Sequence, residues 1–302
     1  MVKIPVAQPF IGKEEASAAF KVVKKGWISM GEKVKQFEKN IAKFTNTKYA
    51  VAMNNGTSTL DALLTALDIK QNDEVIVPDL TYISTANIVS YKNAKLILCD
   101  SDAQTFNTTK EKIEKRITKK TKLIIITDMK GMPVNYDEVK ELSKKYRIPI
   151  IADSAESLGA KYKNKQVGSQ CIAHSFSLFA NKNITTGEGG LVVTNSDKLY
   201  KKLKMIRNQG QLSRYNHIIL GNNYRMTDIQ ASIGIVQLKK LNRIIKNKNK
   251  TAKFYNDRLK KLKNVILPYV PNYVSQHAWY NYSIKVNPQI RNKLIKFLKK
   301  ME

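Results

Sequence analysis

The sequence predicts an α/β domain built around a largely parallel sheet, and two observations carry this prediction. Short apolar runs rich in β-branched residues recur along the chain, and amphipathic helical patterns lie between most of them. Runs that are apolar throughout are typical of strands covered by helices on both faces. The predicted strands are 49–53, 74–77, 96–99, 123–127, 148–152 and 191–194, and the clearest helices are 14–25, 34–44, 57–67, 136–146 and 289–300.

Length and composition indicate a globular protein. The chain has 302 residues, of which 42% are hydrophobic and 25% charged, enough for one large domain or for one large and one small domain. It shows no export leader at its beginning and no apolar run of about 18 residues. Cys99 and Cys171 lie far apart, and the three histidines lack metal-ligand spacing. We therefore expect a cytoplasmic protein with no membrane contact and no metal.

The net charge of +29 raises nucleic-acid binding as an alternative. Lysine pairs, however, are spread over many predicted helices, without interleaved aromatic residues or a recognised binding module. Lysine also far outnumbers arginine, the better bidentate reader of phosphates and bases. The sequence disfavours a nucleic-acid partner, although a general attraction to anionic substrates remains consistent with the charge.

The first predicted strand leads into a candidate anion site. Strand 49–53 passes through an Asn-Asn-Gly turn ending at Gly56, and the next helix opens with Thr57 and Ser58. Free backbone N–H groups and the helix dipole at such a turn both face an incoming phosphate. The alternative is that Thr57 or Ser58 is only the N-cap of the helix.

Two further candidates follow predicted strands. Tyr82 lies just beyond strand 74–77, where an ordinary core tyrosine is the alternative to a ligand contact. Asp153 lies at the carboxyl end of strand 148–152, and Glu156 follows it. Ligands of open α/β sheets gather at this edge, and an acid next to a buried strand needs a cationic partner. A helix N-cap role for Asp153 is the alternative and is compatible with that partner.

The most informative stretch is 175–190, which places Ser177 five residues before Lys182. Small and polar residues flank this lysine between two strand-like runs, so its amine is expected to point into a cleft. A partly desolvated lysine amine in a cleft can attack a carbonyl carbon to form a Schiff base. A solvated surface lysine is the alternative that holds for most lysines.

The stretch Ser-Phe-Ser-x-Phe-x-x-Lys-x-Ile-Thr-Thr-Gly-Glu-Gly-Gly resembles the cofactor-lysine segment of the DegT/DnrJ/EryC1/StrS family. These are sugar aminotransferases that use pyridoxal 5'-phosphate (PLP). The segment from Asp153 is similar to the family pattern Asp-x-Ala-[Glu/Gln/His]-x-x-Gly. Residues 221–231 resemble its Gly-x-Asn-Tyr-Arg-Met-[Thr/Ser]-[Asp/Asn]-x-Gln-Ala signature. The resemblance covers nearly the whole chain.

The resemblance implies a role for each candidate residue. Lys182 matches the Schiff-base lysine, which a dehydratase subgroup replaces by histidine, so lysine favours transamination. By the same resemblance, Asp153 pairs with the pyridinium nitrogen, Tyr82 stacks on the ring, Glu156 lies close to the cofactor, Gly56, Thr57 and Ser177 bind its phosphate, and Asn223 reaches that phosphate across a homodimer interface.

The resemblance also implies the architecture, a fold-type I PLP-dependent transferase. We expect a PLP-binding large domain with an N-terminal arm over 1–240 and a small α+β domain over 241–302, with a strand at 280–286. Family members usually continue through further small-domain elements, so the small domain is expected to be truncated.

The expected activity is transfer of an amino group from an amino acid, usually glutamate in this family, to a nucleotide-linked keto-sugar. A 4-keto-6-deoxy sugar in cell-surface polysaccharide or glycan precursor synthesis is one candidate, because the motifs most resemble the GDP-perosamine synthase branch. A truncated relative that binds PLP but has little activity, or a regulatory role, remains the alternative.

Overall fold

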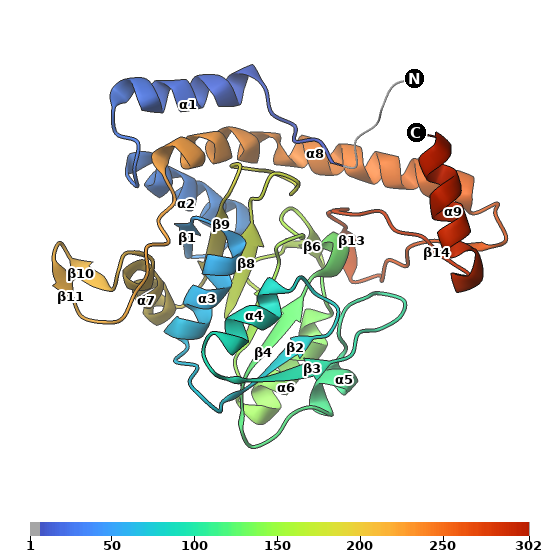
Figure 1. The fold of residues 1–302 in the computed structure, drawn as a ribbon, viewed down its shortest axis with the longest axis horizontal. Coiled ribbons are helices and arrows are strands. Elements are labelled where there is room, and N and C mark those ends of the chain that lie inside the picture. Colours follow the sequence, from blue (N-terminus) through green and yellow to red (C-terminus); the bar gives the residue numbers. More distant parts are fainter. Residues whose placement is uncertain (1–6, 302) are drawn as a thin grey trace.

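The computed structural model describes residues 7–301, so the first residues, which bear on the expected lack of a leader, lie outside the described part. The centre of the fold is a seven-stranded sheet in the order β1-β9-β8-β5-β4-β2-β3 (Figure 1). Its strands are β1 (Tyr49–Met53), β2 (Glu74–Pro78), β3 (Lys95–Cys99), β4 (Thr121–Thr127), β5 (Ile150–Asp153), β8 (Ala173–Ser177) and β9 (Gly190–Thr194).

The sheet is mostly parallel, as predicted. Strands β8, β5, β4, β2 and β3 run parallel to their neighbours, while β9 is antiparallel to both β8 and β1. The carboxyl ends of the five parallel strands therefore meet at one edge. This edge is the expected location of a ligand site in an open α/β sheet.

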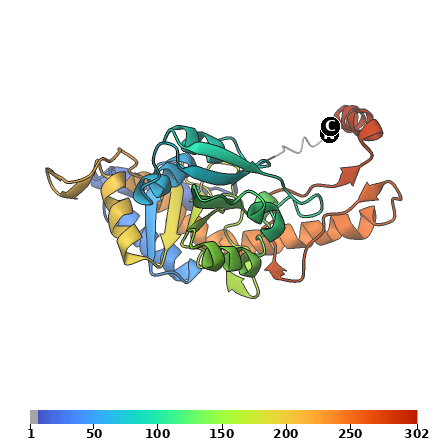
Figure 2. The same cartoon turned by 90° about the horizontal axis from the view of Figure 1, so that it is seen from below.

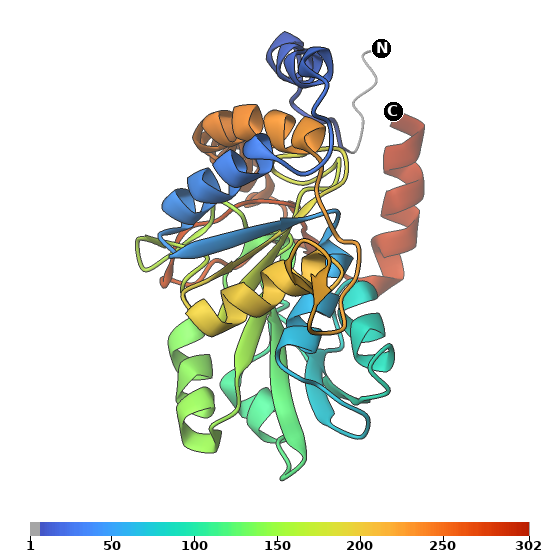
Figure 3. The same cartoon turned by 90° about the vertical axis from the view of Figure 1, so that its left-hand side faces the viewer.

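Helices cover both faces of the sheet, as the turned views show (Figures 2 and 3). The alternating side chains of β4 illustrate the arrangement. Ile124 and Ile126 pack in one core cluster with α2 (Glu32–Thr45), α6 (Tyr136–Tyr146) and α8 (Asp228–Leu259). Leu123 and Ile125 pack in the other with α3 (Gly56–Ala66), α4 (Ser84–Ser90) and α7 (Asp197–Arg207). Apolar side chains on both faces explain why the predicted strands are apolar throughout.

Helix α8 organises the side of the molecule that carries the N-terminal helices. It begins with a capping box in which Thr227 and Gln230 satisfy each other's backbone N–H groups. The Asp228 carboxylate accepts hydrogen bonds from the backbone N–H groups of Gly31 and Val34, both at 2.9 Å, which fixes the start of α2 against α8. Helix α1 (Lys13–Lys25) lies along α8 (Figure 1) and is tied to it by Lys240, whose amine pairs with Glu14 and Glu15.

The remaining elements are short. Helix α5 (Lys110–Glu114) and the 3-10 turn η1 (Met129–Gly131) flank β4. Strands β10 (Gln211–Ser213) and β11 (Asn216–His217) form a hairpin that projects from the body (Figure 1). Strands β6 (Lys161–Tyr162), β7 (Lys165–Gln166) and β13 (Val274–Gln276) form a small sheet, and β12 (Val265–Ile266) pairs with β14 (Lys285–Val286) ahead of α9 (Pro288–Met301). Within residues 7–301, no helix is both long and apolar enough to cross a membrane.

The carboxyl-terminal region differs from expectation. The strand predicted over 280–286 is wrong, because only Lys285–Val286 is a strand, while Tyr280 lines a cavity instead. The charged stretch 246–250 has the composition of an interruption between two helices, but it lies within the continuous helix α8. The domain boundary predicted between residues 240 and 241 also falls inside α8, so the division into two domains remains a prediction.

Candidate active site

A cavity of about 450 Å³ lies at the carboxyl edge of the parallel strands. It brings together every predicted site residue except Asn223, namely Gly56, Thr57, Tyr82, Asp153, Glu156, Ser177 and Lys182. They come from the turn before α3, the loop after β2, the ends of β5 and β8, and the loop after β8. Asn223 is exposed and lies outside this cavity of its own chain.

Lys182 lies in the loop between β8 and β9, where its backbone N–H closes a turn onto the Phe179 carbonyl at 2.9 Å. Only 15% of its side chain is exposed, which rules out the fully solvated alternative. The amine lies 3.7 Å from Glu156 Oε1 and 4.2 Å from the centre of the Tyr280 ring. The loop therefore aims a primary amine into the cavity.

Asp153 ends β5 and is buried at the bottom of the site. Its Oδ2 accepts a hydrogen bond from Thr85 Oγ1 at 2.7 Å, and its Oδ1 accepts one from the Ala155 N–H at 3.1 Å. Burial raises the pKa of this carboxyl, and Lys182 opposes the rise only in part. Turns rather than a helix follow Asp153, so the helix N-cap interpretation is wrong. A buried carboxyl that faces a cavity suits a cationic ring nitrogen.

Glu156 lies between Lys182 and the backbone of η1. Its Oε2 accepts a hydrogen bond from the Lys130 N–H at 2.7 Å, while its Oε1 faces the Lys182 amine. Burial raises the pKa of this carboxyl, and the nearby Lys182 charge lowers it. The lysine amine is therefore held by an acidic neighbour on the wall of the cavity.

The turn before α3 presents donors to the same cavity. The N-cap is Asn55, whose side chain accepts from the Ser58 N–H at 2.8 Å, so the alternative of Thr57 or Ser58 as N-cap is wrong. Within the described residues, the N–H groups of Gly56 and Thr57 donate no hydrogen bond. These free donors, the helix dipole and the nearby Ser177 hydroxyl make a cradle of the kind that suits an anion.

Close backbone packing sets the position of this cradle. A Cβ on Gly56 would lie 3.2 Å from the Ser177 Cβ, and a Cβ on Gly190 would lie 2.3 Å from the Asn55 carbonyl oxygen. The turn therefore packs directly against β8 and β9, and this contact requires glycine at both positions.

Several residues that support or line the cavity were not found from the sequence. Thr85 orients Asp153, and Tyr280 covers the Lys182 amine from a segment near the other end of the chain. Thr127 and Asn181 also line the cavity. Thr85 lies in a hydroxyl-rich stretch that matches no motif, and Tyr280 lies in a predicted strand. Nothing in the sequence around either residue therefore indicates a role in the site. Tyr82 lines the cavity with 75% of its surface exposed, which excludes the core-tyrosine alternative.

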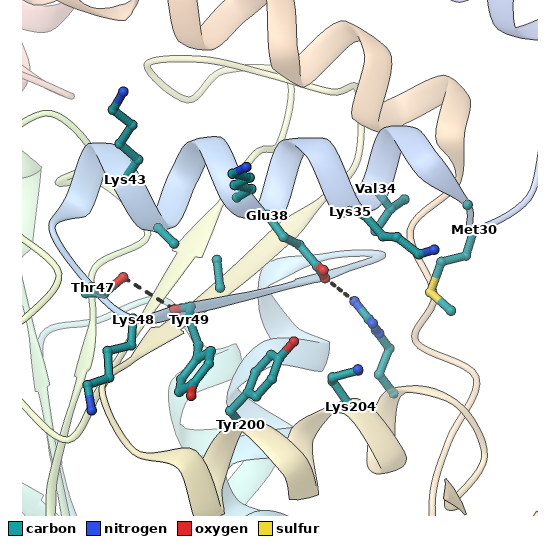
Figure 4. A pocket seen from close by; sticks show the side chains of 15 residues that line it. Met30, Val34, Lys35, Glu38, Lys43, Thr47, Lys48, Tyr49, Tyr200 and Lys204 are labelled. Atoms are coloured by element: carbon teal, nitrogen blue, oxygen red, sulfur yellow. Dashed lines mark hydrogen bonds and ion pairs between the residues drawn. The ribbon is translucent and has the colours of Figure 1, made fainter. Parts of the chain in front are cut away.

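A second, larger cavity of about 590 Å³ lies between α2, β1 and α7, away from all these residues (Figure 4). Its inner charges neutralise each other, because Glu38 forms an ion pair with Arg207 and both also bond to the backbone of Ala52. Tyr49 and Tyr200 stack on its wall with ring centres 4.1 Å apart. None of the site residues predicted from the sequence lines this cavity, and its one acidic lining residue, Glu38, is paired with Arg207, so we do not assign the activity to it.

The residues of the first cavity fit PLP. An amine for the aldehyde, a buried carboxyl for the ring nitrogen and a cradle of unused donors for the phosphate face one space. Each complements a different functional group of this cofactor.

Comparison with known proteins supports PLP as the cofactor of this chain. The profile of the DegT/DnrJ/EryC1/StrS aminotransferase family matches residues 9–302. A GDP-perosamine synthase of Caulobacter vibrioides is 38% identical over 98% of this chain and 81% of its own length. The crystal structure of an aminotransferase from Psychrobacter cryohalolentis matches with a TM-score of 0.92 and 31% identity, covering 96% of this chain and 80% of that one.

A structure with PLP bound is similar as well. The GDP-4-keto-6-deoxy-D-mannose-3-dehydratase of E. coli, with bound hydrated PLP, matches with a TM-score of 0.93 and 27% identity, covering all of this chain and 84% of that one. Three comparisons indicate the same family. They are the family profile, which matches almost the whole chain, the sequence relatives and the fold. The chain therefore belongs to the DegT/DnrJ/EryC1/StrS family of PLP-dependent sugar aminotransferases.

Proposed function

We propose that this enzyme transfers an amino group from an amino acid, with glutamate as the expected donor, to a nucleotide-linked keto-sugar. A 4-keto-6-deoxy sugar is the first candidate, because the relative from Caulobacter is a GDP-perosamine synthase. The observation that carries the proposal is the presence of the Lys182 amine and the buried Asp153 carboxyl in one cavity. Lysine at this position, instead of the histidine of the dehydratase subgroup, favours transamination.

The side chains divide the work between binding and proton transfer. Bound PLP supplies an electron sink for the carbanion that forms at the amino-bearing carbon. Asp153 would keep the ring nitrogen protonated. The Lys182 Nζ would move a proton between the amino-bearing carbon of the substrate and the bound cofactor in each half of the reaction. The N–H groups of Gly56 and Thr57 and the Ser177 hydroxyl hold the phosphate, and Tyr82 supplies an aromatic plane.

A homodimer is part of this proposal. Asn223 and the β10–β11 hairpin lie close together in the chain, and the hairpin region exposes Leu212, Tyr215, Ile218 and Leu220. Exposed apolar side chains of this kind are typical of a protein interface. We infer that this region contacts a second copy and that Asn223 completes the phosphate site of that copy.

The test of the activity follows the transfer of nitrogen from the donor to the sugar, rather than the consumption of substrate. The enzyme is incubated with 15N-glutamate and a panel of nucleotide-linked keto-sugars, and mass spectrometry detects 15N in an amino sugar. Lys182→Ala and Asp153→Asn proteins are the controls and should transfer no label above background. A product that has lost water but carries no 15N would instead indicate a dehydratase and would refute the proposal.

A further inference from the structure

A third cavity, of about 530 Å³, adjoins the active-site cavity and shares Asn181, Lys182 and Tyr280 with it. Its far wall is the middle of α8, with Arg243, Ile244, Asn247 and Lys248, and its floor is the segment from Trp279 to Asn281. A molecule that reacts at Lys182 can therefore extend past Tyr280 into this third cavity.

The charged side chains on the wall of this cavity are all basic. Among the described residues that line the cavity, Arg243, Lys248 and Lys182 are basic and none is acidic. Lys240, which lies about one turn before Arg243 on α8, is neutralised by Glu14 and Glu15. In the described part of the chain neither Arg243 nor Lys248 forms an ion pair with a carboxylate, although α1 provides that partner to Lys240.

Lys248 is the better anchored of the two. Its amine donates a hydrogen bond to Asn183 Oδ1 at 2.6 Å, a neutral acceptor. The Asn183 amide is fixed in turn, because its Nδ2 donates to the carbonyls of Leu158 and Ala278 at 3.2 and 3.3 Å. Burial without an anion lowers the pKa of Lys248 to about 8. A cation positioned in this way, and not compensated by the protein, suits an anionic ligand.

We propose that this cavity binds the diphosphate of the nucleotide-linked sugar, with Lys248 and Arg243 as its anion-binding and specificity residues. The inference rests on the proposed function, whose substrate joins a neutral sugar to a diphosphate. The two joined cavities match that sequence of groups, because the sugar carbon must reach Lys182 and the charged groups must lie one sugar beyond it. The carboxylates of the amino donor are the other possible anion, but the volume far exceeds what a carboxylate fills.

Binding to the PLP-loaded enzyme tests the assignment without turnover. GDP, UDP and inorganic pyrophosphate are titrated by calorimetry into the wild type, Lys248→Met and Arg243→Gln. Because a lost charge-assisted hydrogen bond weakens binding by about ten-fold or more, we expect such a rise in the Kd of the ligand that binds. Lys248→Arg, which keeps the charge, should recover most of the affinity, and unfolding temperatures verify that each variant folds.

The matched control is Lys246→Met, which removes one charge from the same helix at an exposed position outside the cavity. It should change the Kd by less than about two-fold, which separates a local contact from the general effect of the net charge. Failure of all three ligands to bind the wild type, or equal binding by Lys248→Met, would overturn the inference. So would a loss of glutamate affinity in Lys248→Met with diphosphate binding intact.

The two proposals fail in different ways. Diphosphate binding that depends on Lys248, together with no 15N transfer to any sugar, would reject the proposed function and retain the anion site. Transfer of 15N to a sugar by Lys248→Met at wild-type KM would retain the function and reject the anion site.

Discussion

At the scale of single residues, Lys182 is distinguished by its surroundings rather than by its type. Most lysines of this chain are exposed, whereas Lys182 lies between Glu156 and the Tyr280 ring on the wall of a cavity. We expect Lys182→Ala to lose both the yellow absorption of the loaded enzyme and the cofactor that borohydride fixes to the protein. Intact-mass spectrometry after reduction measures the second quantity. Cofactor still fixed to the Ala variant would show that another lysine holds it.

Asp153 offers a test that separates a functional role from a structural one. Because burial raises its pKa, the charged carboxylate has a free-energy cost in the folded protein without cofactor. The variant Asp153→Asn can keep a hydrogen bond to Thr85, so the cofactor-free protein should unfold at an unchanged or slightly higher temperature. Its PLP affinity should nevertheless fall, and its half-reaction with glutamate should slow by orders of magnitude, since the ring proton loses its partner.

The opposite pattern would remove Asp153 from the mechanism. A structural acid would give a large fall in the unfolding temperature of the cofactor-free protein with an unchanged glutamate half-reaction. Thr85→Val is a useful companion variant, because it removes only the hydroxyl that orients Oδ2. It should weaken PLP binding less than Asp153→Asn does.

At the scale of elements, the cradle depends on how β9 packs against the turn before α3. A methyl group on Gly190 would meet the Asn55 carbonyl oxygen at 2.3 Å, and this backbone contact cannot be relieved by a rotamer change. Gly190→Ala should therefore displace the turn, destabilise the fold by about 1–3 kcal/mol and weaken PLP binding. Denaturant unfolding and PLP titration measure the two effects.

Gly12→Ala is the matched control, because a Cβ there meets nothing within 4 Å and the residue does not line the active-site cavity. It should leave PLP affinity unchanged. Equal PLP binding by Gly190→Ala would show that the cradle does not depend on this contact.

The elements that were predictable from the sequence are those whose signal is local. The strands of the sheet are apolar on both faces, and the helices between them have clear stripes, so their positions follow from the run of residues alone. The segment 280–286 has the composition of a strand, but Tyr280 and its neighbours are fixed by contacts with Lys130 and Lys182, far away in the chain. Similarly, α8 continues through its charged stretch because Ala252 and Ile245 still face buried surroundings.

The site was predictable to the extent that it consists of motifs next to strand ends. Gly56, Asp153 and Ser177 lie within or directly after elements that meet at one edge of a parallel sheet. Thr85 orients Asp153 and Tyr280 lines the cavity, and both act through contacts between distant parts of the chain that no spacing in the sequence expresses. The hydrogen bond from Lys248 to Asn183 also joins distant parts of the chain, so it could not be predicted from the sequence.

At the scale of the whole molecule, the predicted site is incomplete within one chain. Asn223 is exposed and lies outside the cavity that contains the other predicted residues. The hairpin near it presents apolar side chains to solvent, which a second copy would cover. A symmetric dimer places the same surface on both copies, so each chain would complete the site of its partner.

Mixed dimers test this arrangement directly. Lys182→Ala and Asn223→Ala proteins should each be inactive or nearly so when alone. After unfolding and refolding together in equal amounts, random pairing should give heterodimers in which one site has both Lys182 and the Asn223 of the other chain. About a quarter of all sites would then be intact, and activity should recover toward that fraction. Variants that recover no activity on mixing, or a wild type that is monomeric at full PLP affinity, would show that each chain builds its site alone.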